Sequence, residues 1–260
     1  MSKKVSVITT TYQDLSHLEE VVEGIKKQDY DHIEYIIVDG GSKDGTVEFL
    51  KKQEAEFANL TGWEYKWISE PDKGIYDAIN KGIRMATGDI VGTAFDKFAS
   101  VDVLSRMVSA IEDDGTDGVH GDLLYVDEED KPVRTWVMGN KQTIKDGWMP
   151  AHPTLYLKKE IYDKYGVYKT DYKIAADYEY MVRILWDGSV KLSYIPEVLI
   201  HMFYGGTSSG GFSNYVRSFM ESHRALKENR VPFAFMICTK RTIKVLLQFV
   251  KAACQKKETR

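Results

Sequence analysis

Residues 69–96 restrict the fold of this chain more than any other stretch, because a polar turn, a helix and a buried strand follow one another there without a break. The helix is predicted from apolar and small residues at helical spacing: Ile75, Ala78, Ile79, Gly82, Ile83 and Ala86. The polar residues fall on the other side: Asp77, Asn80, Lys81 and Arg84. Gly88 ends the helix, and the strand from Asp89 to Ala94 carries Asp96 to its carboxyl end. Ligands of open α/β sheets bind beyond such strand ends, so we expect the turn and Asp96 to face one crevice.

The same order of strand and helix precedes this stretch. Strands are predicted at 5–10, 34–38 and 63–69, and a helical pattern follows each one. Ser16 and Glu19 fit a capping box at the start of the first helix. Strands and helices that alternate at this period predict a parallel sheet with right-handed crossovers.

The pattern changes after a helix near 101–111. Residues 118–125 and 132–137 fit two strands around an acidic turn, which predicts an antiparallel edge. Residues 138–153 fit a loop, and the remaining predictions are a strand at 154–157, a helix at 175–186, a strand at 190–195 and two final helices. We therefore predict an α/β fold with a doubly wound, mostly parallel sheet, an antiparallel edge and C-terminal helices. Residues 1–212 are assigned to one catalytic-type domain and 213–260 to a helical extension.

The composition excludes several classes of protein. A chain of 260 residues, 43% of them apolar, can bury one core, with or without an appended segment. A net charge of −4 argues against nucleic acid as a partner. The two cysteines, Cys238 and Cys254, provide neither a disulfide framework nor zinc-site spacing, which favours the reducing cytoplasm. We find no signal-peptide core and no apolar run of roughly 18 residues, so we expect a cytoplasmic protein, soluble or peripheral.

Basic charge is concentrated near the C-terminus. Residues 239–260 hold seven Lys and Arg and one acidic residue, so they carry +6 and the remainder of the chain −10. Apolar residues recur beside this charge at helical spacing: Ile243, Leu246, Leu247, Val250 and Ala253. A basic amphipathic helix of this kind is expected to dock on the anionic surface at the inner face of the cell membrane. The same pattern fits a helix packed on the domain almost equally well.

Polar side chains follow three of the predicted strands. Thr10 and Tyr12 lie at the end of the first strand, Asp39 at the end of the second and Asp96 near the end of the fourth. Tyr12 has a ring that could stack on a base, and Asp39 could accept a hydrogen bond from a base imide or a ribose hydroxyl. Each of these residue types is also a common turn former after a strand.

Three segments together resemble a known family. They are VSVITTTY at 5–12, VDGGSKDGT at 38–46 and SEPDKGIYDAINKG at 69–82, and they closely resemble the family 2 glycosyltransferases of bacterial surface-polysaccharide pathways. The resemblance extends from residue 4 to about residue 210 and implies the GT-A fold and a nucleotide-sugar donor. It implies that Thr10, Tyr12 and Asp39 hold the nucleotide. It also implies that Lys73 and Asp77 border the nucleotide and its diphosphate.

The family's metal motif is altered in this chain. Family members commonly end the fourth strand with two acids, the last of which binds a divalent cation on the diphosphate. Residues 92–98 read GTAFDKF, so Asp96 takes the place of that last acid and Phe95 the place of the first. One direct carboxylate is compatible with Mg²⁺ or Mn²⁺, because diphosphate oxygens and waters can complete the coordination shell. The alternative is that the site has decayed and Asp96 is a loop acid.

Residues 174–183, IAADYEYMVR, resemble the family's motif with an acid at the start of a helix. An inverting transferase needs a carboxylate to take the proton from the acceptor hydroxyl, and we assign this role to Asp177. Its structural alternative is an acid that stabilises a helix N-terminus. Trp148 is expected to lie under an acceptor sugar and His152 to bind substrate. His201 is expected to approach the diphosphate or the metal. For Trp148 and His152, simple packing is almost as good an interpretation.

The sequence thus predicts an inverting, metal-dependent glycosyltransferase of hexosyltransferase type. Its acceptor is expected to be a saccharide, with a lipid-linked saccharide implied by the resemblance. One alternative is a catalytically degenerate nucleotide-sugar-binding protein of the same fold. A sugar nucleotidyltransferase is disfavoured, because a glycine-rich basic loop is expected after its first strand and this chain has Thr-Thr-Thr-Tyr at 9–12.

Overall fold

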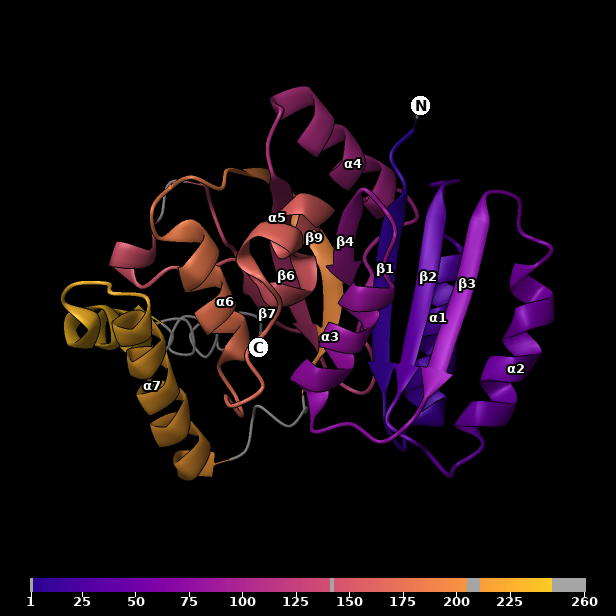
Figure 1. The fold of residues 1–260 in the computed structure, drawn as a ribbon, viewed down its shortest axis with the longest axis horizontal. Coiled ribbons are helices and arrows are strands. Elements are labelled where there is room, and N and C mark those ends of the chain that lie inside the picture. Colours follow the sequence, from indigo (N-terminus) through magenta and orange to yellow (C-terminus); the bar gives the residue numbers. More distant parts are fainter. Residues whose placement is uncertain (1, 141–142, 205–210, 245–260) are drawn as a thin grey trace, which may run out of the picture.

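The computed structural model describes residues 2–140, 143–204 and 211–244, and Figure 1 shows its helices packed around one twisted sheet. The strands are β1 (Val5–Thr11), β2 (Ile33–Asp39), β3 (Trp63–Ser69), β4 (Ile90–Thr93), β5 (Lys97–Phe98), β6 (Gly118–Val126), β7 (Pro132–Trp136), β8 (Tyr156–Lys158) and β9 (Leu192–Phe203). The α-helices are α1 (Leu15–Lys26), α2 (Thr46–Phe57), α3 (Ile75–Met85), α4 (Val103–Asp114), α5 (Lys159–Tyr165), α6 (Ala176–Leu185) and α7 (Gly211–Glu228). Short 3₁₀ turns occupy Ile144–Asp146 and His152–Thr154.

The N-terminal half forms the parallel part of the sheet. β3, β2, β1 and β4 lie in that order, and each neighbouring pair is parallel. Side chains alternate between the two faces. Ile8 and Ile36 belong to the core that includes α3, whereas Val7 and Ile37 belong to the core with α1, α2 and α4. The sheet is therefore covered on both faces, as its nearly uncharged strands predict.

The second half supplies the antiparallel strands. β8 pairs antiparallel with both β4 and β6, and β7 pairs antiparallel with β6. β9 runs parallel to β6 and antiparallel to β5. The predicted α/β fold with an antiparallel edge is confirmed. The prediction of a strand ending at residue 195 was too short, because β9 continues to Phe203, and helix α5 was not predicted.

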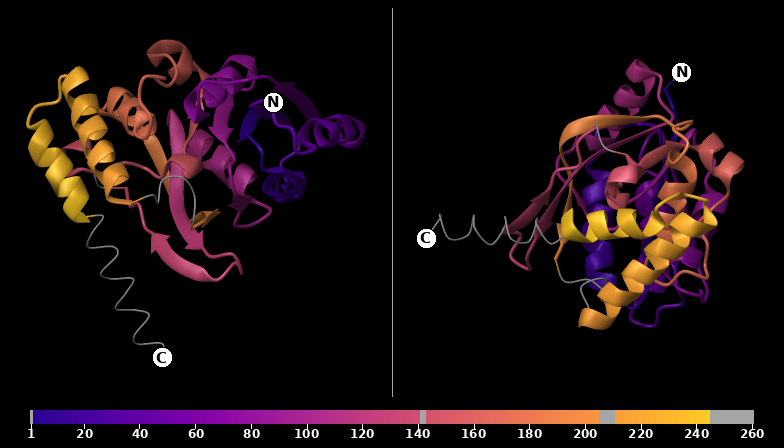
Figure 2. Two further views of the ribbon diagram at one scale, coloured as in Figure 1. Left: turned by 90° about the horizontal axis from the view of Figure 1, so that it is seen from below. Right: turned by 90° about the vertical axis from the view of Figure 1, so that its left-hand side faces the viewer.

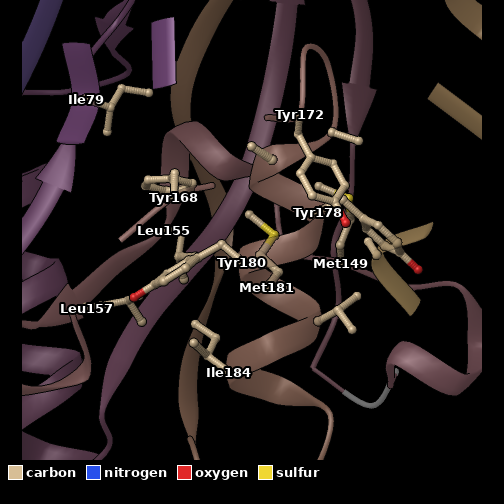
Figure 3. Packing of buried hydrophobic residues seen from close by; sticks show 14 of the residues in the cluster. Ile79, Met149, Leu155, Leu157, Tyr168, Tyr172, Tyr178, Tyr180, Met181 and Ile184 are labelled. Carbon is tan, nitrogen blue, oxygen red and sulfur yellow. The ribbon is translucent and has the colours of Figure 1, made fainter. Parts of the chain in front are cut away.

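Helix α6 lies in a core rich in tyrosine (Figure 3). The Tyr180 ring lies 5.4 Å from the Tyr162 ring and 4.7 Å from the Tyr168 ring, centroid to centroid. Ala225 and Leu226 of α7 belong to the same core. The proposed boundary between residues 212 and 213 falls inside α7, and the C-terminal helices share the core of the domain.

Residues 234–244 form a further helical segment that lies beside α7 at the end of the molecule remote from β3 (Figure 2). None of the helices in the described part of the chain is long and apolar enough to cross a membrane. Most of the predicted amphipathic tail, residues 245–260, lies outside the described residues.

Local predictions were wrong at Ser16 and Asn80. Ser16 does not cap α1, because the helix already begins at Leu15, whose backbone N–H donates to Asp44 Oδ2 at 3.0 Å. Asn80, assigned to the polar side of its helix, is buried. Its amide exchanges two hydrogen bonds with the backbone of Tyr168, which lies far away in the sequence. A buried polar side chain is stable when both of its groups are paired in this way.

Candidate active site

A cavity of about 360 Å³ lies beside the first turn of α6 and has Asp177 in its wall. The wall is mostly aromatic and apolar, with a few polar side chains among its members. Those used below are Tyr76, Phe95, Tyr125, His152, Met202, Tyr215, Ser218 and Arg241. They come from α3, the segment after β4, β6, the loop before β8, β9, α7 and the 234–244 helix. Elements from both halves of the chain therefore meet around the predicted base.

Tyr76 links α3 to the start of α6. Its hydroxyl donates to the backbone oxygen of Ile174 at 2.7 Å and lies 3.4 Å from Asp177 Oδ1. Burial raises the pKa of the Tyr76 phenol well above its usual value, and the charge of Asp177 adds to the shift, so the hydroxyl stays protonated. Tyr76 was not singled out from the sequence, because its partners follow about a hundred residues later. It is a positioning residue for Asp177.

His152 contributes to the same wall. Its Nε2 lies 2.9 Å from the Tyr168 hydroxyl, and its ring stacks on Phe95 with centroids 5.9 Å apart. Burial lowers the pKa of His152, while the charge of Asp177 opposes this shift, so the imidazole is neutral near pH 7. The structure brings His152 and Asp177 together at one cavity, as the sequence suggests.

Glu179, two residues after Asp177, has a structural role. It is fully buried and accepts contacts from Lys169 at 2.9 Å, Arg183 at 2.8 Å and Asn229 at 3.2 Å. These contacts tie α6 to the segment before it and to the end of α7. Of the two acids in the motif, Asp177 therefore faces the cavity and Glu179 faces the core.

Asp96 lies just beyond β4 and is 8% exposed. Its Oδ1 accepts a hydrogen bond from the backbone N–H of Phe203 at 3.1 Å, and His17 Nε2 lies 4.0 Å from the same oxygen. Burial raises the pKa of Asp96, and the Phe203 N–H and nearby cations oppose this shift. Asp96 is next to the cavity, because the residue before it, Phe95, is in the cavity wall.

The surroundings of Asp96 fit one kind of metal site. Within residues 2–140, 143–204 and 211–244, no group of three or more His, Cys, Asp and Glu side chains is placed to hold an ion. An ion enclosed by protein ligands does not fit. The second oxygen of Asp96, Oδ2, has no hydrogen-bond partner among these described residues. A hard oxygen ligand of this kind fits Mg²⁺ or Mn²⁺ whose other positions are taken by diphosphate and water.

The strand ends predicted to hold the nucleotide meet at one edge. Thr11 is paired with Asp39 in the β1–β2 register, and the preceding Thr10 is half-buried. Tyr12 is 65% exposed, and Gly40 leaves no room for a side chain: an added Cβ would lie 3.0 Å from the Tyr12 ring and 2.8 Å from Asp72. Tyr12 therefore presents an open aromatic ring at the carboxyl edge of the sheet.

Asp39 is buried, and its carboxylate is already engaged. It accepts hydrogen bonds from the backbone N–H and hydroxyl of Ser42 and from the hydroxyl of Ser69. Here Asp39 holds the loop after β2 against the end of β3. Contact with a nucleotide would require one of these hydroxyls to give way.

Lys73 and Asp77 lie where the turn enters α3. The backbone N–H of Lys73 donates to Asp77 Oδ2 at 3.0 Å, and that of Gly74 donates to Asp72 Oδ1 at 2.8 Å. The Lys73 side chain is exposed. Because Asp77 follows Tyr76, the same turn of α3 borders both the predicted donor edge and Asp177.

Trp148 and His201 are less closely tied to the site. The indole N–H of Trp148 donates to the Met138 backbone oxygen at 3.0 Å, its ring packs on His120, and it is not in the wall of the cavity. His201 lies within β9 opposite Lys97. Its neighbour Met202 is in the cavity wall, so strand alternation turns His201 to the other face.

Comparison with known proteins identifies the family. Residues 6–167 match the model of glycosyl transferase family 2, more than half of the chain. This protein belongs to glycosyl transferase family 2. An uncharacterized glycosyltransferase of Mycobacterium tuberculosis is 35% identical over 191 residues, which cover 69% of this chain and 68% of that protein. A PGL/p-HBAD biosynthesis glycosyltransferase of Mycobacterium bovis is 25% identical over 211 residues, 78% of each chain.

Solved structures agree with the GT-A fold of this glycosyltransferase. The mannosyltransferase PcManGT of Pyrobaculum calidifontis, in complex with GDP-Man and Mn²⁺, matches with a TM-score of 0.62 at 18% identity and covers 100% of this chain and 80% of its own. TarS residues 1–349 of S. aureus, in complex with UDP-GlcNAc, match with a TM-score of 0.64 at 17% identity, covering 86% of this chain and 66% of that one. The chain spans 39% of the longer TarS structure. The family and the fold expected from the sequence are confirmed.

Proposed function

We propose that this glycosyltransferase moves a hexose, with inversion, from a nucleotide sugar to a saccharide acceptor on a lipid carrier, in surface-polysaccharide synthesis. The observation that carries the proposal is Asp177, in the wall of a cavity and beside the hydroxyl of Tyr76. The M. bovis relative is named for PGL/p-HBAD biosynthesis, which supports a role in surface-glycan synthesis. Complexes of the structural neighbours with UDP-GlcNAc and GDP-Man support the donor class.

The proposed reaction uses Asp177 as its base. The acceptor hydroxyl oxygen forms a bond to the anomeric carbon, and the bond from that carbon to the diphosphate breaks on the opposite side. Asp177 takes the hydroxyl proton, and the nucleoside diphosphate leaves with the bonding electrons. Tyr76 keeps Asp177 directed into the cavity, and the apolar wall excludes water from the reacting atoms.

We propose that Asp96 is the protein ligand of the divalent cation. Mn²⁺ in the complexes of PcManGT and of GalNAc-T7 supports this assignment. The ion would neutralise negative charge on the departing diphosphate. Thr10, Tyr12, Asp39, Lys73 and Asp77 remain our proposed contacts to the nucleotide and its diphosphate.

The second candidate is a nucleotide-sugar-binding protein that has lost catalytic activity. The single carboxylate of the metal loop favours this candidate. A panel of UDP-, GDP- and dTDP-sugars separates the two. Both candidates bind one nucleotide class, but only the enzyme transfers or hydrolyses the sugar when Mn²⁺ or Mg²⁺ is added. Binding without metal-stimulated turnover, for every sugar and acceptor offered, would favour the second candidate.

Tyr12→Ala should weaken nucleotide binding about 10-fold, because stacking of a base on an aromatic ring contributes roughly 1–3 kcal/mol. Calorimetric titration with the preferred nucleoside diphosphate measures the loss. Tyr12→Phe keeps the ring and serves as the control. Full affinity in the Ala variant would show that Tyr12 does not stack on the base.

We also propose that the C-terminal helices rest on an anionic membrane surface. Apolar side chains are exposed on α7 and around the 234–244 helix: Val216, Met220, Phe233, Phe235, Met236 and Ile243. Phe219 and Phe235 join the two helices through ring contact at 5.9 Å. The exposed Arg217 and Lys240 lie on the same helices. Apolar side chains beside basic charge are typical of interfacial helices.

Truncation after Lys244 should strongly weaken sedimentation with anionic liposomes and leave donor binding unchanged. The cut removes four basic residues, and each contributes about 1 kcal/mol near an anionic leaflet. Cutting earlier would remove Arg241, which packs inside the protein. Neutral liposomes are the control. The membrane proposal fails if the truncated protein sediments as fully as the intact protein, or if the intact protein does not sediment at low salt.

A further inference from the structure

Arg241 belongs to the predicted basic tail, yet its side chain is in the wall of the cavity that contains Asp177. Among the described residues, the wall contains two charged side chains, Asp177 and Arg241, and the neutral imidazole of His152. The Arg241 guanidinium and the Asp177 carboxylate form no ion pair in the described part of the chain. The cavity thus carries a carboxylate and a separate cation.

The guanidinium of Arg241 is held from several sides. Its Nη1 donates to the hydroxyl of Ser222 in α7 at 2.7 Å, and its Nη2 lies 3.4 Å from the sulfur of Met149. The guanidinium carbon lies 4.4 Å from the centre of the Tyr178 ring of α6. A cation over an aromatic face is stabilised electrostatically. These contacts fix the side chain before any ligand binds.

The backbone at Arg241 is fixed as well. Gly147 adopts φ +71°, and a Cβ added there would lie 2.7 Å from the backbone nitrogen of Arg241. The helix therefore packs against a position where only glycine leaves enough room. Gly147 and Met149 belong to the same loop, so this loop and the 234–244 helix form one rigid wall of the cavity.

The charge of Arg241 is not neutralised by a neighbouring carboxylate. Other arginines on these helices are paired: Arg183 lies 2.8 Å from Glu179, and Arg224 contacts Glu228 at 2.6 Å. In the described part of the chain, no carboxylate oxygen lies within 4.0 Å of the Arg241 guanidinium. A guanidinium has five N–H donors, and the contacts to Ser222 and Met149 use two of them. The remaining N–H donors leave this guanidinium able to bind an anionic ligand.

We propose that Arg241 binds an oxyanion of the acceptor, a phosphate or a carboxylate, while Asp177 faces the hydroxyl that is glycosylated. The inference rests on the proposed transferase function and names the chemical class of its acceptor. Arginine suits this task because its planar fork matches carboxylate and phosphate oxygens. The donor diphosphate is expected at the strand ends near Asp96 and Lys73. Arg241 instead belongs, like Tyr215 and Ser218, to the part of the cavity wall formed by the C-terminal helices.

The test uses four octyl-linked derivatives of one hexose. One is neutral, one carries a 6-phosphate, one is the uronate, and one joins hexose and octyl through a diphosphate. Calorimetry measures the binding of each to the full-length protein saturated with the preferred nucleoside diphosphate. The wild type should bind at least one anionic compound about 10- to 100-fold more tightly than the neutral one, as expected of charge-assisted hydrogen bonds. The compound preferred distinguishes a sugar phosphate, a uronate and a lipid diphosphate as the source of the oxyanion.

Arg241→Gln should remove this preference and leave the affinities for the neutral compound and the nucleoside diphosphate unchanged. Arg241→Lys should recover part of the preference, because charge returns without the planar fork. Lys227→Gln, which removes an exposed charge from α7, is the matched control and should keep the full preference. Thermal melting verifies that each variant is folded.

Three results would overturn the proposal. The first is a wild type that binds no anionic compound better than the neutral one. The second is an Arg241→Gln variant whose affinity for the neutral compound falls as much as its affinity for the anionic compounds. That result would make Arg241 a structural part of the wall. The third is a loss of nucleotide affinity, which would place Arg241 on the donor. Failure of the transferase function itself would appear separately, as absence of metal-stimulated sugar release in the wild type.

Discussion

Asp177→Asn should lower kcat about 10²-fold or more and change donor affinity little. The substitution keeps the size of the side chain and much of its hydrogen bonding, but the amide cannot take a proton from the acceptor hydroxyl. Steady-state transfer measures the loss in kcat, and calorimetry with the nucleoside diphosphate measures donor affinity. A fall in kcat at constant donor affinity is the signature of a group that acts in the transition state.

Asp163→Asn is the control for Asp177→Asn, because it removes the same charge from the exposed face of α5. It should retain wild-type kcat. If Asp177→Asn instead loses donor affinity in proportion to kcat, Asp177 binds substrate or stabilises the start of α6. Wild-type turnover in the Asn variant would exclude Asp177 as the base.

Asp96→Ala should abolish the stimulation of turnover by Mn²⁺ or Mg²⁺, a loss of about 10²-fold or more. A metal ion on a leaving diphosphate contributes several kcal/mol to transition-state stabilisation, and Asp96 is the protein ligand that we assign to it. Turnover measured against metal concentration gives both the maximal rate and the metal affinity. The fold should persist, because in the described part of the chain the Asp96 carboxylate accepts one backbone hydrogen bond, from Phe203.

Asp96→Asn separates the two roles of the side chain. The amide oxygen can still accept the Phe203 N–H, whereas the charge that attracts a cation is absent. The Asn variant should melt close to the wild type and still lose metal stimulation. Wild-type activity of Asp96→Ala in Mn²⁺ would show that the metal assignment is wrong and that Asp96 serves the loop alone.

The sequence predicts most of the parallel half of the fold, because its signals are local. Apolar strands and helical spacing lie within a few residues of one another at 69–96, and the structure follows them. The predicted helix stop at Gly88 was wrong, because α3 ends at Met85, Ala86 is extended and Gly88 has no left-handed conformation. Asn80 was misplaced because its burial depends on the backbone of Tyr168, which no local pattern reveals. β9 was predicted too short because its pairing with β6 and β5 carries it onward through polar residues such as His201.

The same distinction applies to the candidate site. Asp177 and His152 could be found because each stands in a motif, and the structure brings both to one cavity. Tyr76 and Arg241 could not be found, because their roles depend on contacts across the fold. Trp148 is of a residue type that can lie under a sugar, and in the structure its ring packs on His120 outside the cavity wall. Its role at the acceptor stays a prediction.

The close approach of Gly147 to Arg241 limits how this enzyme can be recombined with its relatives. The N-terminal half carries the strand ends proposed for the donor, and the C-terminal helices carry the wall proposed for the acceptor. A chimaera that imports a new C-terminal segment keeps the donor half intact. The chimaera must, however, keep a glycine at 147 wherever the imported helix approaches as closely as the 234–244 helix does, because any side chain at 147 would collide with the helix backbone. Exchange of acceptor specificity by a single crossover before α7 is therefore compatible with the host loop as long as that loop retains Gly147.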